Sequence, residues 1–480
     1  MAETTTPTPT PDLASLGFAT LTDLNSLVRV VEARDLLDNA GTCSHPIRLT
    51  GTRDVIEVGT GVLLDSSSGQ ITVSCGNRRA SVCAYCSTLY KYDAYNLVAA
   101  GLRGGKDVPA TVGTHPRLFV TLTAPSFGPV HLGPDKRGNL RPCKPRRDGT
   151  GCRTWHRTGD PQIGTPLDPS GYDYQGHALF NALAGRLWSA TLTEVRRSLA
   201  RALGVPRSRL GDLVRVSFAK VAEYQARGIV HFHAVARLDG PDGSASAPPS
   251  SVTAELLQAA IRDGVARTSV EVPESRTLGR PVAGWGEQID IRPIGSAEFD
   301  DGARLSDVAV ARYIAKYATK SAESAGVELP PLACRPCAGS GRTLVRVADY
   351  DDTLIPCRSC SGAGRTIDLD QWELTDHARR LIDTCWSLGA IPELAPLRLR
   401  RWAHMLGFGG HFATKSRTYS TTFAALRQER ADFTARRDPY TLALTDSPNV
   451  LVINHWAYAG HADTFQSSIS HGTADLEGVS

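Results

Sequence analysis

The residues best suited to chemistry are two histidines one residue apart, His231 and His233, within KVAEYQARGIVHFHAVARL. A three-residue hairpin loop at 226–228, with Gly228 in the left-handed conformation, would set the register of the two flanking strands. Counting from that loop places Glu223 opposite His231, on the same sheet face as both imidazoles. Two imidazoles and one carboxylate suit a divalent metal that keeps positions open for water or substrate. The alternatives are an amphipathic strand with solvated histidines, or a one-residue register shift that removes Glu223 from the site.

The other residues of this hairpin alternate toward the opposite face and are almost all apolar. We expect that face to lie in the core, and Lys220 is the one charged residue on it. The apolar positions are Val214, Val216, Phe218, Ala222, Tyr224, Val230, Phe232, Ala234, Ala236 and Leu238.

A second group of reactive side chains occurs in VAVARYIAKYATK, where Tyr313 and Tyr317, and Lys316 and Lys320, are each four residues apart. On a helix these four side chains share a face about 100° wide. The chain has only eight lysines, so two within five residues are unlikely to arise from composition alone. A nearby cation favours the phenolate form of tyrosine, and lysine can hold a phosphate oxygen. The alternative is an ordinary core helix whose tyrosines pack and whose lysines extend into water.

The elements that must position these residues follow one another in an informative order. Alternation and helical periodicity predict strand, helix, strand, strand, helix, strand and a final helix, which is the split βαβ or ferredoxin-like arrangement with helices on one sheet face. The predicted ranges are 117–123, 172–203, 213–224, 229–238, 252–268, 288–294 and 303–325. The predicted fold class is therefore α+β, with a central antiparallel sheet.

Four cysteines form a strong zinc signature. Cys334 and Cys337 are separated from Cys357 and Cys360 by 19 residues, and both pairs continue as Cys-x-x-Cys-x-Gly-x-Gly. This spacing is typical of a closed four-thiolate Zn²⁺ site. The repeats resemble the zinc-binding repeats of DnaJ-type chaperones, although the J-domain signature is absent.

Two further groups are less complete. A second zinc site is predicted from Cys43, Cys75, Cys83 and Cys86, with His45 as an alternative to Cys43. Cys143, Cys152 and His156 offer three ligands without an obvious fourth, so metal binding there stays open. We expect Cys385 to lie in the core.

Length and composition limit the number of domains and the class of protein. A chain of 480 residues predicts two to four domains, and 41% hydrophobic with 21% charged residues excludes a wholly disordered or fibrous protein. The net charge of +4 neither requires nor excludes a polyanionic partner. We find no apolar run long enough to cross a bilayer and no signal-peptide pattern at the start, so we expect a cytoplasmic protein without membrane association.

The domain organisation that we predict has six parts. These are a disordered tail with a short helix (1–40), a Cys-rich zinc or DNA-binding module (41–105), a catalytic domain (106–330, with an insertion at 134–170), a zinc ribbon (331–366), a helical DNA-binding region (367–445) and a flexible tail (446–480). In the helical region we expect helices at 369–386 and 420–436, the second Arg-rich and suited to single-stranded or hairpin DNA. A solvated helical face is the alternative.

The ordered motifs resemble those of the HUH endonucleases, which include rolling-circle replication initiators, two-tyrosine transposases and relaxases. The closest resemblance is to the replication initiators of actinobacterial plasmids and integrative elements. It rests on HPRLFVTLTAPSFGPVH, KVAEYQARGIVHFHAVARLDG, YIAKYATK and RWAHMLGFGGHFATKSRTYSTTF, spread over residues 115–423.

The resemblance implies an HUH palm and a metal-dependent nickase and strand transferase. Mg²⁺ or Mn²⁺ would be held by His231 and His233, with Glu223 as third ligand. Tyr313 or Tyr317 would attack origin DNA, become linked to its 5′ phosphate and free a 3′-OH primer. Lys316 and Lys320 would orient the phosphate, and the host helicase and DNA polymerase are candidate partners.

Two rival functions are compatible with the same residues. A two-tyrosine transposase or relaxase would use the same residues on other DNA. A non-catalytic zinc protein that binds nucleic acid would bind DNA without cutting it.

Overall fold

The computed structural model describes residues 40–135, 137–143, 151–279, 281–295, 305–345, 353–435 and 449–462. Contacts divide the chain into two compact units, residues 91–425 and residues 1–90 with 426–480. The tail predicted at 1–40 lies outside the described residues except for Ala40. None of the described helices has the length and apolar character required to span a bilayer.

A six-stranded sheet in the order β12-β4-β5-β3-β8-β9 forms the centre of the larger unit. Neighbouring strands from β12 to β8 run antiparallel, and β9 pairs parallel to β8. The strands are β3 (Arg117–Leu122), β4 (Arg215–Tyr224), β5 (Val230–Asp239), β8 (Ile289–Gly295), β9 (Leu305–Ser306) and β12 (Ala413–Lys415). The chain order β3-α3-β4-β5-α4-β8 confirms the predicted strand and helix succession, and the strand order is that of a split βαβ arrangement.

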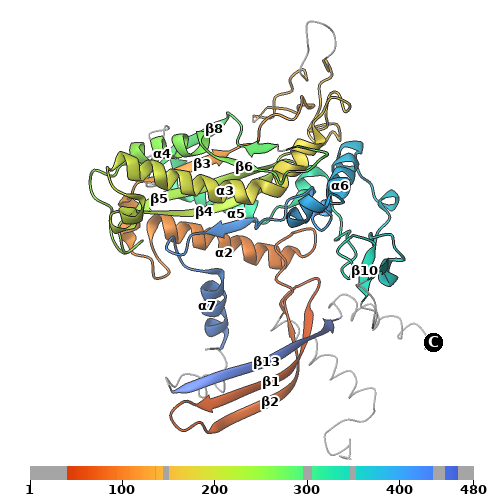
Figure 1. Cartoon of the computed structure of the whole chain (residues 1–480). Coiled ribbons are helices and arrows are strands. Elements are labelled where there is room, and N and C mark those ends of the chain that lie inside the picture. Colours follow the sequence, from red (N-terminus) through yellow and green to blue (C-terminus); the bar gives the residue numbers. More distant parts are fainter. Residues whose placement is uncertain are drawn as a thin grey trace, which may run out of the picture. The chain divides into compact units, whose positions relative to one another are not determined.

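Helices α3 (Tyr174–Ala202) and α4 (Ala254–Ala266) cover one face of this sheet (Figure 1). Their N-termini are capped by Asp173 and Thr253, whose side chains accept hydrogen bonds from backbone amides of the first turn. The predicted apolar positions of β4 and β5 lie on this side, nearly all of them buried in the main core. Lys220 lies there as well, with its Nζ 3.8 Å from the ring centroid of Phe232. Burial lowers the pKa of Lys220 to about 7.

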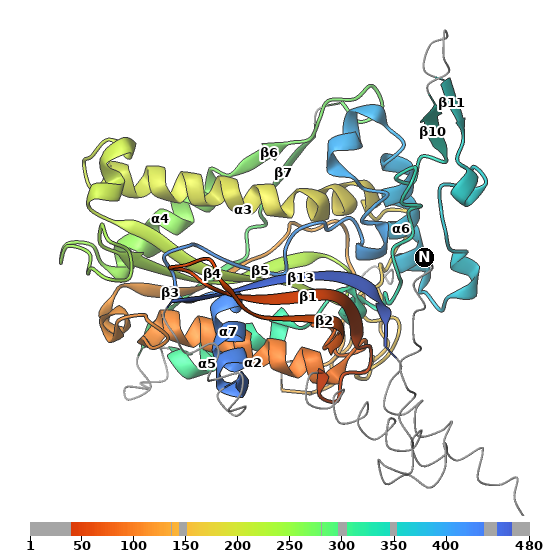
Figure 2. The ribbon, with the colours of Figure 1, turned by 90° about the horizontal axis from the view of Figure 1, so that it is seen from below.

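The opposite sheet face is covered too, which corrects the expectation of helices on one face only. Helix α5 (Asp307–Ala318) and the part of α2 (Ala84–Arg103) from Lys91 onward lie on this side (Figures 1 and 2). Ala219, Val221 and Val235 on this face are buried. The reason is that this face also carries apolar residues, so it too has to be covered.

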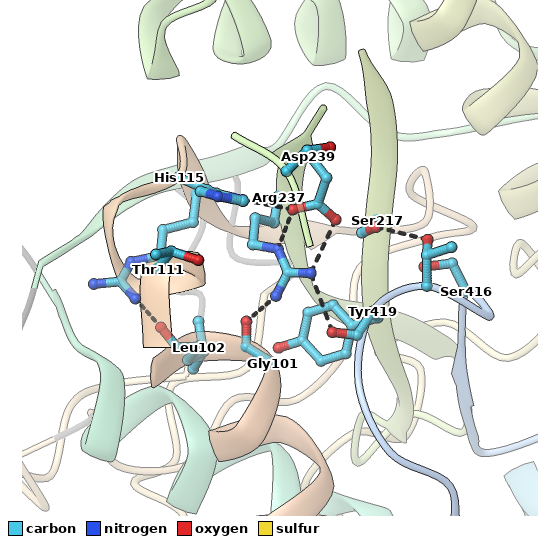
Figure 3. A network of polar contacts seen from close by, with 12 residues as sticks. Gly101, Leu102, Thr111, His115, Ser217, Arg237, Asp239, Ser416 and Tyr419 are labelled. Carbon is cyan, nitrogen blue, oxygen red and sulfur yellow. Dashed lines mark hydrogen bonds and ion pairs between the residues drawn. The ribbon is translucent and has the colours of Figure 1, made fainter. Parts of the chain in front are cut away.

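A buried ionic network joins the sheet to its surroundings on this second face (Figure 3). The fully buried guanidinium of Arg237 donates to Asp239 at 2.6 and 2.9 Å, to the Tyr419 carbonyl at 3.1 Å and to the Gly101 carbonyl. Nδ1 of His115 lies 2.8 Å from the same carboxylate. A buried charge is tolerated because it is paired and hydrogen-bonded, and here the pair fixes β5 to α2 and to the segment after β12.

The predicted helical region is only partly helical. It contains α6 (Asp376–Leu388) and α7 (Phe423–Ala435), close to two predicted helices, and short 3-10 turns. Residues 413–415 instead form edge strand β12 of the central sheet. Cys385 on α6 is fully buried, as expected. The remaining short strands of this unit are β6 (Ser269–Glu271), β7 (Val282–Gly284), β10 (Arg342–Val345) and β11 (Thr353–Pro356).

The smaller unit contains a three-stranded antiparallel sheet in the order β13-β1-β2. Its strands are β1 (Ile47–Glu57), β2 (Leu63–Val73) and β13 (Val450–His461). The prediction of a flexible tail from residue 446 is therefore wrong for β13, which pairs along the whole length of β1. Residues 463–480 lie outside the described residues.

Candidate active site and metal-ligand clusters

The turn between β4 and β5 has the predicted geometry. Gly228 has a φ of 81°, and the amide of Gln225 donates to the carbonyl of Ile229 at 2.9 Å. Glu223 pairs with His231, and Val221 pairs with His233. The predicted register is therefore confirmed, and both histidines share a sheet face with Glu223.

Three side chains from this hairpin converge on one point. Oε2 of Glu223 lies 2.9 Å from Nε2 of His231 and 2.9 Å from Nε2 of His233, and the two nitrogens are 3.2 Å apart. Ligand atoms in adjacent positions of an octahedral ion with bonds of about 2.1 Å are about 3.0 Å apart. The three atoms therefore fit one face of a six-coordinate divalent ion and leave the other positions open. We call Glu223, His231 and His233 the triad.

The ring nitrogens that face away from the triad are also occupied. Nδ1 of His233 lies 3.0 Å from Oγ1 of Thr121, and Nδ1 of His231 lies 3.4 Å from Nε2 of Gln225. Phe119 stacks on His233 with an interplanar angle of 8°. Outer contacts of this kind fix the orientation of a ligating imidazole. Sequence reasoning missed these partners, although Phe119 and Thr121 stand on one face of the FVTLT strand.

The charges at the triad suit cation binding. Burial alone would raise the pKa of Glu223, but hydrogen bonds with His231 and His233 outweigh it and lower the pKa to about 2. Burial lowers the pKa of His233, which is only 3% exposed. At neutral pH the site therefore offers an anionic carboxylate and a neutral imidazole, the forms that coordinate a metal.

Helix α5 carries both tyrosines to the triad. Ser306 caps its N-terminus through the amide of Ala309, and Val310, Ile314 and Ala318 are buried along one side. The phenol oxygen of Tyr313 lies 3.3 Å from Nε2 of His233. The ring centroid of Tyr317 is 5.6 Å from that of His233 and 4.6 Å from that of Tyr313. The structure thus brings together the histidine and tyrosine motifs, which lie 80 residues apart in the chain.

Both lysines lie beside the second tyrosine of the helix. Nζ of Lys316 lies 5.5 Å and Nζ of Lys320 lies 4.8 Å from the ring centroid of Tyr317, so both cations flank the second tyrosine. The helix ends at Ala318, before Lys320. Burial raises the pKa of both Tyr313 and Tyr317. Both phenols are therefore protonated at neutral pH in this arrangement, so the expectation of a phenolate favoured by the lysines is wrong for it.

Comparisons with known proteins place the chain in a family. A family model described as "RepSA: Replication initiator protein, pSAM2" matches residues 29–473. A replication initiator protein of Streptomyces ambofaciens is 42% identical over 471 residues, which cover 94% of this chain and 92% of that protein. The chain belongs to the RepSA family of replication initiator proteins. No solved structure shows a significant match to this initiator.

The four cysteines predicted as a ribbon lie together in the initiator. The Sγ atoms of Cys334 and Cys357 are 3.9 Å apart, and those of Cys337 and Cys360 are 3.8 Å apart. For tetrahedral zinc with bonds of about 2.3 Å, sulfur atoms are about 3.8 Å apart. The group therefore has the geometry to hold zinc.

The repeated glycines explain how the two knuckles fit together. The amide of Cys334 donates to the carbonyl of Gly364, and the amide of Cys357 donates to the carbonyl of Gly341, both at 2.8 Å. Both glycines have positive φ, and a Cβ on Gly341 would lie 2.2 Å from the carbonyl oxygen of Gly362. Only glycine satisfies both requirements.

The second predicted cysteine group also converges. The Sγ atom of Cys86 lies 3.6 Å from that of Cys75 and 3.7 Å from that of Cys43, and Cys83 lies 3.8 Å from Cys43. Cys43 is therefore the fourth member of the group, while His45 is exposed and outside it.

The third group was incomplete in the sequence because its fourth member went unrecognised. His131 joins Cys143, Cys152 and His156, with all four potential ligand atoms within 4.8 Å of one another. His131 lies 12 residues before Cys143, outside the predicted insertion at 134–170, so no metal-binding spacing marks it in the sequence.

Proposed function

We propose that this initiator is an HUH-type endonuclease that nicks single-stranded origin DNA and transfers the strand through a phosphotyrosine intermediate. It would thereby start rolling-circle replication of a plasmid or integrative element. The observation that carries the proposal is the 3.3 Å approach of the Tyr313 phenol oxygen to His233 within the triad. A nucleophile beside a metal-binding group is the minimum that such a reaction requires.

The sheet supports this proposal by the way it presents the triad. Glu223 lies on β4, and His231 and His233 lie on the adjacent strand β5. The tyrosine helix α5 crosses the same face, and Phe119 packs edge-on against Tyr313 at 5.6 Å between ring centroids. We propose that this split βαβ sheet is the HUH palm. Its histidines lie on a central strand, and its tyrosines lie on the helix that crosses the same face.

Glu223, His231 and His233 would hold Mg²⁺ or Mn²⁺. When bound, the ion would polarise the scissile phosphodiester and make phosphorus more electrophilic. Three oxygen and nitrogen donors that leave other coordination positions open suit Mg²⁺ or Mn²⁺. They do not form the closed set of ligands that is typical of a structural zinc site.

The tyrosines would perform the covalent step. A phenol oxygen of Tyr313 or Tyr317 would form a bond to phosphorus while the bond from phosphorus to the 3′ oxygen breaks. The phenol gives up its proton and the departing 3′ oxygen takes one up, so the 5′ phosphate remains esterified to tyrosine and a free 3′-OH is left as primer. The ring centroids of Tyr313 and Tyr317 are 4.6 Å apart, so the second tyrosine would be able to attack while the first is still esterified to DNA.

Lys316 and Lys320 would act on Tyr317 in particular, because both cations lie near its ring. They would hold the phosphate oxygens of the strand attached there and stabilise the departing phenolate. We further propose that the two four-cysteine groups bind structural Zn²⁺. The relatives' description as replication initiators favours replication over transposition.

The decisive test replaces both nucleophiles. Full-length protein is incubated with Mg²⁺ or Mn²⁺ and single-stranded oligonucleotides covering the replicon's origin, and denaturation-resistant protein–DNA adducts are measured. Tyr313→Phe with Tyr317→Phe should abolish the adduct and leave DNA binding within about twofold, because only the phenol oxygens are lost. The two single variants should show which tyrosine forms the first adduct.

Tyr92→Phe is the matched control, since Tyr92 is an exposed tyrosine on the surface. Its adduct yield should equal that of the unmodified protein. An adduct that persists in the double variant would rule out tyrosine catalysis at this site.

A further inference from the structure

The insertion between β3 and α3 contains a group of ligand atoms that the proposed function does not use. Nδ1 of His131 lies 3.1 Å from Nε2 of His156 and 3.7 Å from Sγ of Cys143. Sγ of Cys152 lies 3.5 Å from Nε2 of His156. Cys143 and His156 are buried, with exposed fractions of 0% and 1%.

These separations fit one tetrahedral ion. With bonds of about 2.3 Å to sulfur and 2.05 Å to nitrogen, tetrahedral zinc holds two nitrogens about 3.3 Å apart and a nitrogen and a sulfur about 3.6 Å apart. Two thiolates and two imidazoles are also the donors that zinc prefers. We propose that His131, Cys143, Cys152 and His156 bind one Zn²⁺ ion.

Hydrogen bonds from neighbouring groups hold these side chains in the orientation that a metal ion requires. Nδ1 of His156 lies 2.8 Å from the carboxylate of Asp160, so the proton belongs on Nδ1 and the lone pair of Nε2 points into the group. The other oxygen of Asp160 accepts from the amide of Gln162 at 2.9 Å, which fixes the carboxylate. The amide of Leu132 donates to Sγ of Cys143 at 3.1 Å, as backbone amides do toward a thiolate.

The described part of the insertion has little regular secondary structure. Its described residues between 125 and 172 form no helix or extended strand, only the isolated bridge between Val130 and Pro166. A segment with so few regular hydrogen bonds and little core gains order mainly from a crosslink or a bound metal. The ion would close a loop from His131 to His156.

The same segment reaches the turn of the catalytic hairpin. The amide of His131 donates to the carbonyl of Thr165 at 2.9 Å, and the amide of Gly164 donates to the carbonyl of His131 at 3.0 Å. A Cβ on Gly164 would lie 2.5 Å from the carbonyl carbon of Ala226, in the turn between β4 and β5. Zinc at His131 therefore holds the insertion against the turn that joins the two strands of the triad.

Metal content tests this site independently of activity. Zinc per chain is measured by elemental mass spectrometry on the full-length protein and on the double variant Cys143→Ser with Cys152→Ser. The double variant should contain one zinc ion fewer. Cys385→Ser, which removes a buried thiol outside the three groups, should leave the zinc content unchanged. An unchanged count in the folded double variant would overturn the proposal.

Asp160→Asn decides the question if the double variant does not fold. This change keeps all four ligands but weakens the partner of His156, so one zinc ion should bind about 10 to 100-fold more weakly in competition with a chelator. The other zinc ions should leave at the same chelator concentration as in the unmodified protein. Identical chelator titrations for all zinc ions would overturn the site.

Discussion

The triad and the four-cysteine ribbon are both candidate metal sites, yet they are built in opposite ways. The triad places three ligand atoms, 2.9 to 3.2 Å apart, on one face of a sheet, and the phenol oxygen of Tyr313 lies 3.3 Å from Nε2 of His233. The ribbon surrounds its centre with four sulfur atoms carried by two turns whose backbones bond to each other. One arrangement leaves room for a substrate and the other leaves none.

The two sites also differ in what maintains their geometry. In the triad, Thr121 and Gln225 hold the ring orientation of the histidines, and β3, β4 and β5 hold their positions. In the ribbon two short turns carry all four sulfur atoms, so a bound metal would contribute directly to folding. Loss of metal should therefore cost activity at the triad and stability at the ribbon.

The largest expected effect comes from breaking the triad. His231→Ala should lower the rate of Mg²⁺- or Mn²⁺-dependent nicking by about 10³-fold, because several kcal/mol of charge stabilisation at the phosphate are lost with the ion. The measurement is a single-turnover nicking rate on origin oligonucleotide. The zinc content and the melting temperature should stay close to those of the unmodified protein.

A large fall in zinc content in His231→Ala would contradict this separation of the two kinds of site. So would full nicking activity in this variant, since it would mean that the triad does not hold the catalytic ion.

An intermediate effect is expected from the ribbon. Cys357→Ser should remove one zinc ion per chain and lower the melting temperature by several degrees, because the closed site loses a ligand that nothing else replaces. The rate of nicking by the folded fraction should change by less than about tenfold. Differential scanning calorimetry and elemental analysis provide the two measurements. Loss of nicking with unchanged stability would show instead that the ribbon takes part in the reaction or in DNA binding.

The sequence predicted those parts of the site that depend on local geometry. The register that places Glu223 beside His231 follows from the length of one turn and the position of Gly228, and the structure has it. The face shared by Tyr313 and Tyr317 follows likewise from helical periodicity. Such features depend on a few neighbouring residues only.

Features that depend on distant segments were missed. Thr121 meets His233 only because β3 pairs with β5, more than 100 residues away. The sequence predicts a tail where β13 lies, although VLVINHWAYAG is rich in β-formers, because the partner strand β1 lies some 400 residues earlier in the chain. His131 went unrecognised because an isolated histidine shows no metal-binding spacing without its fold.

The smallest expected effect tests whether metal binding at the triad depends on the contacts that the histidines make through their other ring nitrogens. Thr121→Val keeps the shape of the side chain and removes the hydroxyl that lies 3.0 Å from Nδ1 of His233. The affinity for Mn²⁺, measured by titrating nicking activity and by calorimetry, should fall by about 10-fold, while saturating Mn²⁺ restores most of the rate. If the affinity is unchanged, the stacking of Phe119 on His233 is sufficient to orient the imidazole. The geometry of the triad would then be fixed by packing around its ligands rather than by hydrogen bonds to them.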